Sequence, residues 1–240
     1  MKTLKEYIIE GILDIEDNIE NLTAESLIKD FIRDNYNTTA EIQIKKNGDK
    51  YIVSTKGSVE VENKNITSLT NGVFEWGEVN SFYCYDCISL KDLKGAPEKV
   101  KRNFSCADCT SLESLTGAPK EVGGQFNCDG CTSLKDLTGA PEKVGGWFNC
   151  DNCTSLKDLT GAPKEVKAYF SCSECKSLKD LTGAPEKVGG GFDCSKCTSL
   201  KDLTGAPKEV GGSFECKKCG KRFTREDVIA VCDVKGEIKV

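Results

Sequence analysis

The chain carries seven copies of the pattern Phe-x-Cys-x-x-Cys, and successive copies begin 22 residues apart. A short fixed period indicates a small structural unit that stacks on its own copies, because one unit alone cannot bury its apolar face. The repeat therefore predicts a mainly β solenoid of 22-residue coils. The repeated phenylalanines are Phe82, Phe104, Phe126, Phe148, Phe170, Phe192 and Phe214.

Within one unit, the apolar residues identify the side chains that face the interior. Phe126 and Cys128 alternate with polar residues, which places both side chains on one face of a short strand. Gly139 and Pro141 are expected to turn the chain, and Val144 to return it to the core. The cysteines then act as small apolar core residues, since free cysteine is among the most buried residue types.

The segments on either side of the repeats predict caps, because an open solenoid end exposes apolar side chains and strand edges. The N-terminal segment shows two stretches of helical spacing, the second with Ile28 and Phe31 on its apolar stripe. Asn47-Gly48 predicts a tight hairpin turn, and Thr224 a helix start near the C-terminus. The expected division is 1–37 for a helical segment, 38–81 for a β cap and degenerate first repeat, 82–219 for the repeats and 220–240 for a C-terminal cap.

The extended pattern Phe-x-Cys-x-x-Cys-x-x-Leu-x-x-Leu is similar to the leucine-rich-repeat signature. It looks most like bacterial and phage variants that carry Cys-Thr-Ser-Leu and Gly-Ala-Pro, and the resemblance covers about residues 82–219. It implies a leucine-rich-repeat-like solenoid with a small α/β N-terminal cap, in which the second cysteine of each pair caps backbone groups inside the turn. Two departures are phenylalanine at an aliphatic position and one extra residue between the second cysteine and the first leucine.

The first eleven residues, Met1 to Gly11, resemble the capsid-targeting leaders of internal head proteins in large tailed phages. Those leaders begin Met-Lys-Thr, carry an aromatic-Ile pair and end at a glutamate before a small residue, where a prohead protease cuts. Glu10 followed by Gly11 fits that pattern, so the resemblance implies processing at Glu10 and a phage-encoded protein. The alternative is an ordinary amphipathic helix start.

Composition argues against several classes of function. A net charge of -5, from 33 basic and 38 acidic residues, lacks the basic excess that a nucleic-acid-binding face needs. No apolar run approaches the length of a membrane span, and the N-terminus has no export signal. Fifteen cysteines in such a chain indicate reduced thiols. The expected location is therefore the cytoplasm of a bacterial host or a phage virion.

The sequence also lacks the marks of an enzyme. The chain has no histidine, which excludes Ser-His-Asp and Cys-His catalysis. The recurring Gly-Ala-Pro-x-x-Val-Gly-Gly segment has no Gly-Lys-Ser/Thr and is not a phosphate-binding loop. The carboxylates are spread at regular intervals instead of being paired in one place. We therefore expect a non-enzymatic protein without a cofactor.

The cysteine spacing leaves one alternative open, because two CxxC pairs separated by about twenty residues match common zinc sites. Stacked coils would place equivalent thiols in continuous columns, and seven pairs do not divide into four-thiolate sites. The last pair differs, since Cys216 and Cys219 precede a glycine and Cys232 offers a third thiolate. The alternative function is a zinc-stabilised structural or nucleic-acid-associated protein.

The residues that flank each inward phenylalanine are expected to point outward, and they vary while the core repeats. Such variation is typical of a scaffold that displays a changeable binding surface. Trp147 and Tyr169 would lie on adjacent coils among amides and acids, as aromatic anchors do in protein interfaces. We therefore predict a protein-binding surface for an unidentified partner, and the oligomeric state stays open. Its residues are Gln125, Asn127, Asp129, Trp147, Asn149, Asp151, Tyr169 and Ser171.

Charged pairs after each Ala-Pro alternate in order from one repeat to the next. Glu98-Lys99 is followed by Lys120-Glu121, and this alternation continues through Lys208-Glu209. In a stack of coils, each glutamate would then lie between lysines of the neighbouring coils. The pattern predicts a ladder that opposes coil slippage, because a wrong register places like charges together.

Overall fold

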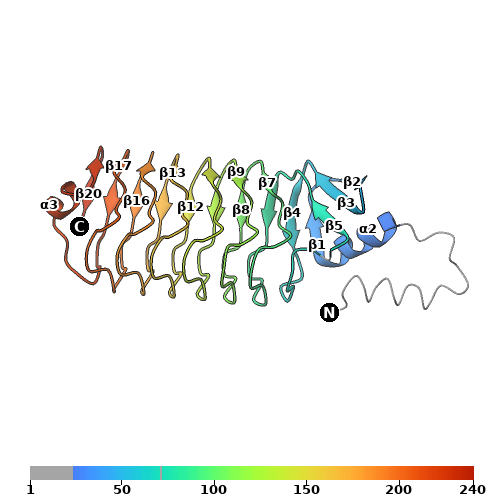
Figure 1. The fold of residues 1–240 in the computed structure, drawn as a ribbon, viewed down its shortest axis with the longest axis horizontal. Coiled ribbons are helices and arrows are strands. Elements are labelled where there is room, and N and C mark those ends of the chain that lie inside the picture. The colour runs from blue at the N-terminus through green and yellow to red at the C-terminus, as the bar shows by residue number, and fades with distance from the viewer. Residues whose placement is uncertain (1–23, 71) are drawn as a thin grey trace, which may run out of the picture.

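The structure is a computed structural model that describes residues 24–70 and 72–240. It confirms a mainly β solenoid of about nine coils with 22-residue spacing and a short helix on the N-terminal side. The coils follow one another along a single long axis (Figure 1). The first predicted helix and the proposed processing site at Glu10 lie outside the described residues.

One side of every coil contributes a short strand to a ten-stranded sheet. Neighbouring repeat strands pair in parallel and in register, so that Phe126 lies beside Phe104 and Phe148. Only the first strand of this sheet, β1, pairs antiparallel. The strands, in order, are β1 (Tyr36–Thr38), β4 (Ser58–Val61), β6 (Ser81–Tyr83), β8 (Phe104–Ser105), β10 (Phe126–Asn127), β12 (Phe148–Asn149), β14 (Phe170–Ser171), β16 (Phe192–Asp193), β18 (Phe214–Glu215) and β20 (Ile238–Lys239).

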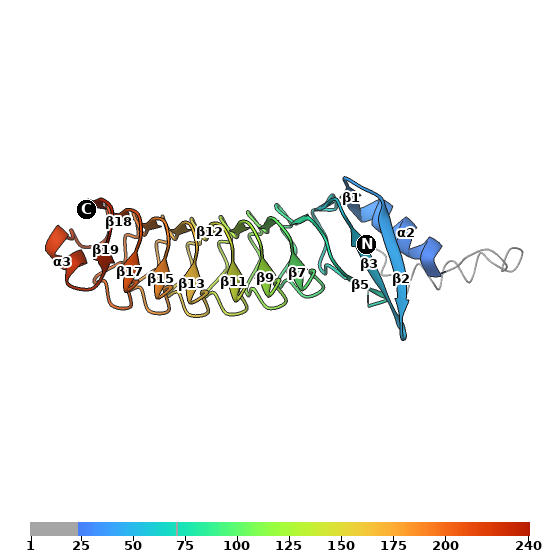
Figure 2. The ribbon, with the colours of Figure 1, turned by 90° about the horizontal axis from the view of Figure 1, so that it is seen from above.

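A second, seven-stranded parallel sheet runs along the other side of the solenoid (Figure 2). Its register aligns the valine of each coil, as in the pairing of Val144 with Val122 and Val166. The sequence predicted that Val144 returns to the core, and its side chain is buried. The strands are β7 (Lys99–Val100), β9 (Glu121–Val122), β11 (Lys143–Val144), β13 (Glu165–Val166), β15 (Lys187–Val188), β17 (Glu209–Val210) and β19 (Asp233–Val234).

The core consists of columns of identical side chains. The repeat phenylalanines are fully buried, and successive rings have centroids 5.1 to 5.8 Å apart. Most of these rings are nearly parallel, because in-register coils present each ring in the same orientation. The paired leucines of each coil, such as Leu134 and Leu137, are also fully buried. Burial of these columns supplies the main drive for stacking.

The N-terminal cap joins the helix α2 (Ala24–Asn35) to a three-stranded sheet in the order β2-β3-β5. Ile28, Phe31 and Ile32 form its buried stripe, as predicted, but the helix ends at Asn35 and Tyr36 already belongs to β1. The hairpin of β2 (Ile42–Asn47) and β3 (Lys50–Thr55) confirms the turn prediction. The positive φ of +61° falls on Gly48 alone, the first of the two loop residues.

The third strand of this cap, β5 (Phe74–Trp76), did not follow from the sequence pattern. It pairs with β3 in parallel, and its two aromatic side chains are buried. The ring of Trp76 lies 5.8 Å from that of Phe82, the first ring of the repeat column. The strand therefore joins the aromatic side chains of the cap to the solenoid core. Its Trp76 side chain packs on Phe82 and covers the end of the phenylalanine column.

The C-terminal cap contains the short helix α3 (Arg225–Ile229), whose start was predicted. The Thr224 hydroxyl accepts a hydrogen bond from the Asp227 backbone N–H at 3.2 Å, and the Asp227 carboxylate accepts one from the Thr224 N–H at 2.9 Å. Strands β19 and β20 complete the last coil and are the outermost strands of their sheets. Ile229, Val231 and Val240 stay exposed at this end, so the cap covers it only in part.

Ion pairs along the second sheet follow the predicted alternation. Glu121 lies between Lys99 and Lys143, with oxygen–nitrogen distances of 3.0 and 2.8 Å. The Lys143 and Lys99 ammonium groups lower the pKa of Glu121 to about 2. Further inter-coil pairs join Lys120 to Glu98, Lys187 to Glu209 and Lys208 to Glu186.

Reversing one step of this ladder should weaken the stack. In a Glu142→Lys, Lys143→Glu variant, the new lysine lies between Lys120 and Lys164, and the new glutamate between Glu121 and Glu165. We expect a melting temperature lower by about 2 °C in low salt, and a smaller difference in high salt because these exposed charges are screened. Circular dichroism measures both. An unchanged melting temperature in low salt would contradict a stabilising ladder.

Candidate functional site

The cysteines form an inter-coil hydrogen-bond ladder inside the solenoid. From the second pair onward, the second thiol donates to the backbone carbonyl of the first cysteine in the preceding coil, as Cys131 does to Cys106 at 3.1 Å. The leucine-rich-repeat resemblance implied that the second cysteine caps backbone groups inside the turn; the thiol does bond to the backbone, but at a carbonyl of the preceding coil. The same bond recurs at 3.0 to 3.3 Å for Cys109, Cys153, Cys175, Cys197 and Cys219.

The surroundings of the thiols oppose formation of a thiolate, which is the form that binds metal or attacks a substrate. Contact with Cys131 and burial raise the pKa of Cys106 well above its ordinary value. Burial raises the pKa of Cys216 to about 12 and that of Cys232 to about 11. Hydrogen bonding to Cys194 and to backbone groups instead lowers the pKa of Cys219, which is half-buried.

The three thiols of the zinc alternative are not gathered into one site. In residues 24–70 and 72–240, no group of three or more cysteine, aspartate or glutamate side chains could hold a metal ion. Cys219 donates its thiol hydrogen bond to the Cys194 carbonyl at 3.3 Å, as its counterparts do in the other coils. The C-terminal pair thus continues the ladder, although its sequence resembles a zinc knuckle.

The predicted binding residues on either side of each phenylalanine flank the ten-stranded sheet, but Asp129 and Asp151 lie in the turns that follow, and Ser171 is buried, contrary to the prediction of an exposed side chain. Gln125, Trp147 and Tyr169 occupy the position before the inward phenylalanine in three successive coils. The Trp147 side chain is 54% exposed, whereas the other tryptophan, Trp76, is buried. The ring centroids of Trp147 and Tyr169 are 5.9 Å apart, with a tilt of 50° between the planes. The structure therefore brings together the aromatic pair that the repeat spacing predicted.

Tyr169 is less exposed than the pattern indicated, because its ring lies over the next coil. A Cβ atom at Gly191 would approach the ring carbon Cε2 of Tyr169 to 2.4 Å. The ring thus occupies the space that a side chain at position 191 would need, and Tyr169 is half-buried. Burial and the charges of Asp193, Glu215 and Asp151 raise the pKa of its hydroxyl.

The amides in the candidate set shape the turn that follows each strand. The side-chain oxygen of Asn127 accepts a hydrogen bond from the Asp129 backbone N–H at 3.0 Å. Asn149 accepts one from the Asp151 N–H at 2.9 Å in the same way. Such side-chain turns are a common use of asparagine and aspartate. Both side chains are half-buried, so they contribute to the scaffold as well as to its surface.

The remaining polar candidates are also engaged within the protein. The Ser171 hydroxyl donates to the Asp151 carboxylate at 2.5 Å, and the Ser173 N–H donates to the same oxygen at 2.7 Å. Asp129 accepts a bond from the side-chain amide of Asn152 at 3.0 Å. Burial raises the pKa of Asp151 above its ordinary range. Of the eight predicted residues, Gln125 and Trp147 therefore present the most exposed surface.

Positions between the cysteines fall into two columns that the sequence did not separate. Asp129 and Asp151 hold the first loop position, whereas Asp86 and Asp108 hold the second. The second position takes a left-handed backbone, with φ of 57° at both Asp86 and Asp108 and 71° at Gly130. Asp, Asn and Gly tolerate that conformation best. Asp129 and Asp151 therefore belong to a different row of the loops from Asp86 and Asp108.

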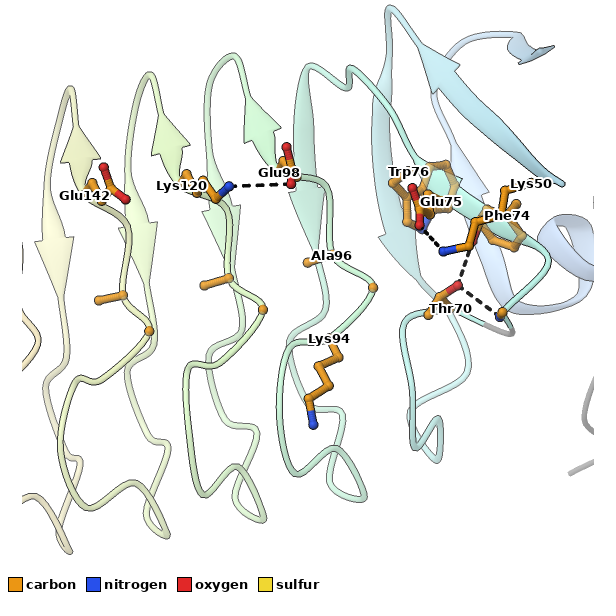
Figure 3. A pocket seen from close by; sticks show the side chains of 16 residues that line it. Lys50, Thr70, Phe74, Glu75, Trp76, Lys94, Ala96, Glu98, Lys120 and Glu142 are labelled. Atoms are coloured by element: carbon orange, nitrogen blue, oxygen red, sulfur yellow. Dashed lines mark hydrogen bonds and ion pairs between the residues drawn. The ribbon is translucent and has the colours of Figure 1, made fainter. Parts of the chain in front are cut away.

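A groove of about 570 Å³ lies on the Gly-Ala turns near the N-terminal cap (Figure 3). Small residues such as Ala96 form part of its lining, and Glu98 and Lys120 pair across neighbouring coils at 3.7 Å. Lys50 and Glu75 form a second ion pair on the cap. These four charged groups in the lining thus form two separate ion pairs.

Comparison with known proteins finds no protein-family model, no curated protein and no solved structure that matches this chain. Within the described residues, no helix is long and apolar enough to cross a membrane.

Two alanine substitutions in one coil distinguish the contribution of the thiol hydrogen bond to the free energy of unfolding from the contribution of side-chain packing. Cys175 donates to the Cys150 carbonyl at 3.1 Å, whereas Cys172 is equally buried and donates no side-chain hydrogen bond in the described structure. Both variants lose the same volume, but Cys175→Ala also removes a donor from a buried carbonyl. We expect Cys175→Ala to cost about 0.5–1 kcal/mol more than Cys172→Ala in urea unfolding followed by circular dichroism. An equal cost for the two variants would show that the bond contributes nothing.

Proposed function

We propose that this protein is a non-enzymatic scaffold that binds another protein through the outer face of its ten-stranded sheet. The observation that carries the proposal is the exposed side chain of Trp147, placed between Gln125 and Tyr169. Large aromatic side chains are the residues that most often anchor protein interfaces. We call the surface formed by Gln125, Trp147 and Tyr169 the aromatic face.

The rigidity of the backbone beneath the aromatic face supports this proposal. The Trp147 carbonyl accepts a hydrogen bond from the Phe126 N–H at 2.8 Å, and the Tyr169 carbonyl accepts one from the Phe148 N–H at 2.8 Å. The neighbouring phenylalanine side chains are buried in the core. An anchor held in this way loses little conformational freedom when a partner binds, which favours affinity.

The variation along this column is a second support. Equivalent positions in successive coils hold Asn103, Gln125, Trp147, Tyr169 and Gly191. The phenylalanine column beside them does not vary, because each of those rings must pack on its own copy. Residues that change on a constant scaffold are typical of a recognition surface.

The biological setting is a further part of the proposal. The chain would be a leucine-rich-repeat-like protein encoded by a phage. It would either be packaged in the virion or act on a host protein, for example a defence factor, in the bacterial cytoplasm. The Cys-Thr-Ser-Leu and Gly-Ala-Pro repeats and the leader-like residues ending at Glu10 support this setting. Nucleic acid and membranes are not proposed as partners, given the net charge of -5.

The aromatic face is tested by partner capture with matched variants. Immobilised protein is incubated with infected and uninfected bacterial lysate, and a captured protein is then purified and its affinity measured directly. We expect Trp147→Ala with Tyr169→Ala to weaken that affinity at least about tenfold, as loss of an aromatic anchor does. Ile88→Ala removes another exposed apolar side chain, 52% exposed, outside this face and should bind normally.

Circular dichroism and the melting temperature of each variant control for folding. Normal affinity of the well-folded double variant would place the binding site elsewhere on the molecule.

A further inference from the structure

Resting on the proposed function, we propose that the aromatic face recognises a cationic side chain, arginine or lysine, in a basic segment of the partner. The cation would lie against the rings of Trp147 and Tyr169 and beside the carboxylates of Asp151 and Asp193. Three observations lead to this partner chemistry. They are the exposed ring face, the position of carboxylates near it, and the ion pairs that nearby lysines form with other acids.

The first observation is the geometry of the rings. Trp147 and Tyr169 meet at 50° with their centroids 5.9 Å apart, and Trp147 is more than half exposed. A tilted pair leaves part of each ring face open to a ligand from the solvent side. Tryptophan gives the strongest cation–π attraction of the natural side chains, and guanidinium groups commonly stack on such rings.

The second observation is the position of Gly191. Because position 191 has no side chain, the Tyr169 ring leans over that coil, which also carries Asp193 two residues further along. Asp193 lies beside Ser171 in the strand register, two residues beyond Tyr169, and the Ser171 hydroxyl donates to Asp151 at 2.5 Å. The aromatic pair is therefore flanked by carboxylates, and a bound cation would gain both kinds of attraction.

The third observation is that these two carboxylates have no lysine or arginine partner in the described structure. Asp193 accepts a hydrogen bond from the Ser195 N–H at 2.8 Å, and Asp151 accepts bonds from Ser171 and Ser173. Nearby lysines are instead held by other acids. Lys196 pairs with Glu174 at 2.6 Å, and Lys239 with Glu215 at 2.9 Å.

Asp151 and Asp193 thus form no ion pair in the described structure, whereas Glu174 and Glu215 each pair with a lysine whose charge also acts on Asp193. A half-buried carboxylate that forms no ion pair and lies beside an aromatic surface favours a partner of opposite charge and disfavours an acidic one. A metal ion does not fit as well, because the two acids are not part of a metal-binding group in residues 24–70 and 72–240. Aromatic rings add nothing to the binding of a hard metal ion, which takes oxygen ligands.

The probe for this proposal is a short peptide of alternating arginine and glycine, with a glutamate–glycine peptide as its negative counterpart. Binding to the full chain is measured by isothermal titration calorimetry and by the change in tryptophan fluorescence. Trp147 is the exposed tryptophan, whereas Trp76 is buried. We expect saturable binding of the arginine peptide that weakens as salt rises, and no binding of the glutamate peptide.

Two variants and one matched control locate the site. Trp147→Ala and Asp193→Asn should each lower the affinity for the arginine peptide at least about fivefold, which is the loss expected for one cation–π or ionic contact. Asp193→Asn keeps the oxygen that accepts from Ser195. Asp180→Asn makes the same charge change at a residue that accepts from the Thr182 N–H at 2.9 Å, and it should bind like the unchanged protein.

The proposal is overturned if the arginine peptide does not bind, if Trp147→Ala binds it normally, or if Asp193→Asn and Asp180→Asn behave alike. The proposed function fails separately. If the double aromatic variant loses the captured partner but that partner's contact segment carries no basic residue, only the cation assignment is wrong. If the double variant keeps its partner, the aromatic face itself is wrong.

Discussion

Parallel in-register stacking requires every residue of a coil to be compatible with its own copy above and below. Phenylalanine satisfies this requirement by stacking ring on ring at 5.1 to 5.8 Å. From the second pair onward, the second cysteine satisfies it by donating its thiol hydrogen to a carbonyl of the preceding coil, and the charged pairs after each Ala-Pro satisfy it by alternating in sign. Glycine recurs at the turn after the second leucine of each coil, where Gly139 has a φ of +92° and a Cβ would come within 2.6 Å of the Thr116 backbone nitrogen.

The same requirement separates scaffold from recognition surface. A position whose side chain packs on its own copies in the neighbouring coils must hold the same residue in every coil. The positions that vary are therefore those whose side chains point away from the core. The column before each phenylalanine meets this criterion, with amides, two aromatics and a glycine in successive coils. The asparagines after Phe126 and Phe148 meet it only in part, because Asn127 and Asn149 accept turn hydrogen bonds. Fewer residues are therefore available for binding at the aromatic face than the sequence pattern indicated.

Features that depend on periodicity or local turn chemistry were predictable from the sequence. The coils, the buried cysteines, the Gly48 hairpin and the helix after Thr224 all follow from residue spacing and from the conformations that glycine and capping residues favour. Contacts that do not follow the 22-residue period were not predictable. Strand β5 forms because its edge pairs with β3, and Tyr169 is half-buried because Gly191 leaves room for its ring. Neither fact has a local sequence signal, and processing at Glu10 stays a prediction.

The most direct test of the central claim, that the thiols are packed core groups that bond to carbonyls, is their accessibility in the native protein. Fully reduced protein is treated with an alkylating reagent in the presence of a metal chelator, and modified cysteines are mapped by mass spectrometry. Fourteen of the fifteen cysteines are buried, so only the half-buried Cys219 should react quickly before denaturant is added. Rapid native modification of Cys131 or Cys153, or dependence of their protection on a chelatable metal, would contradict the account.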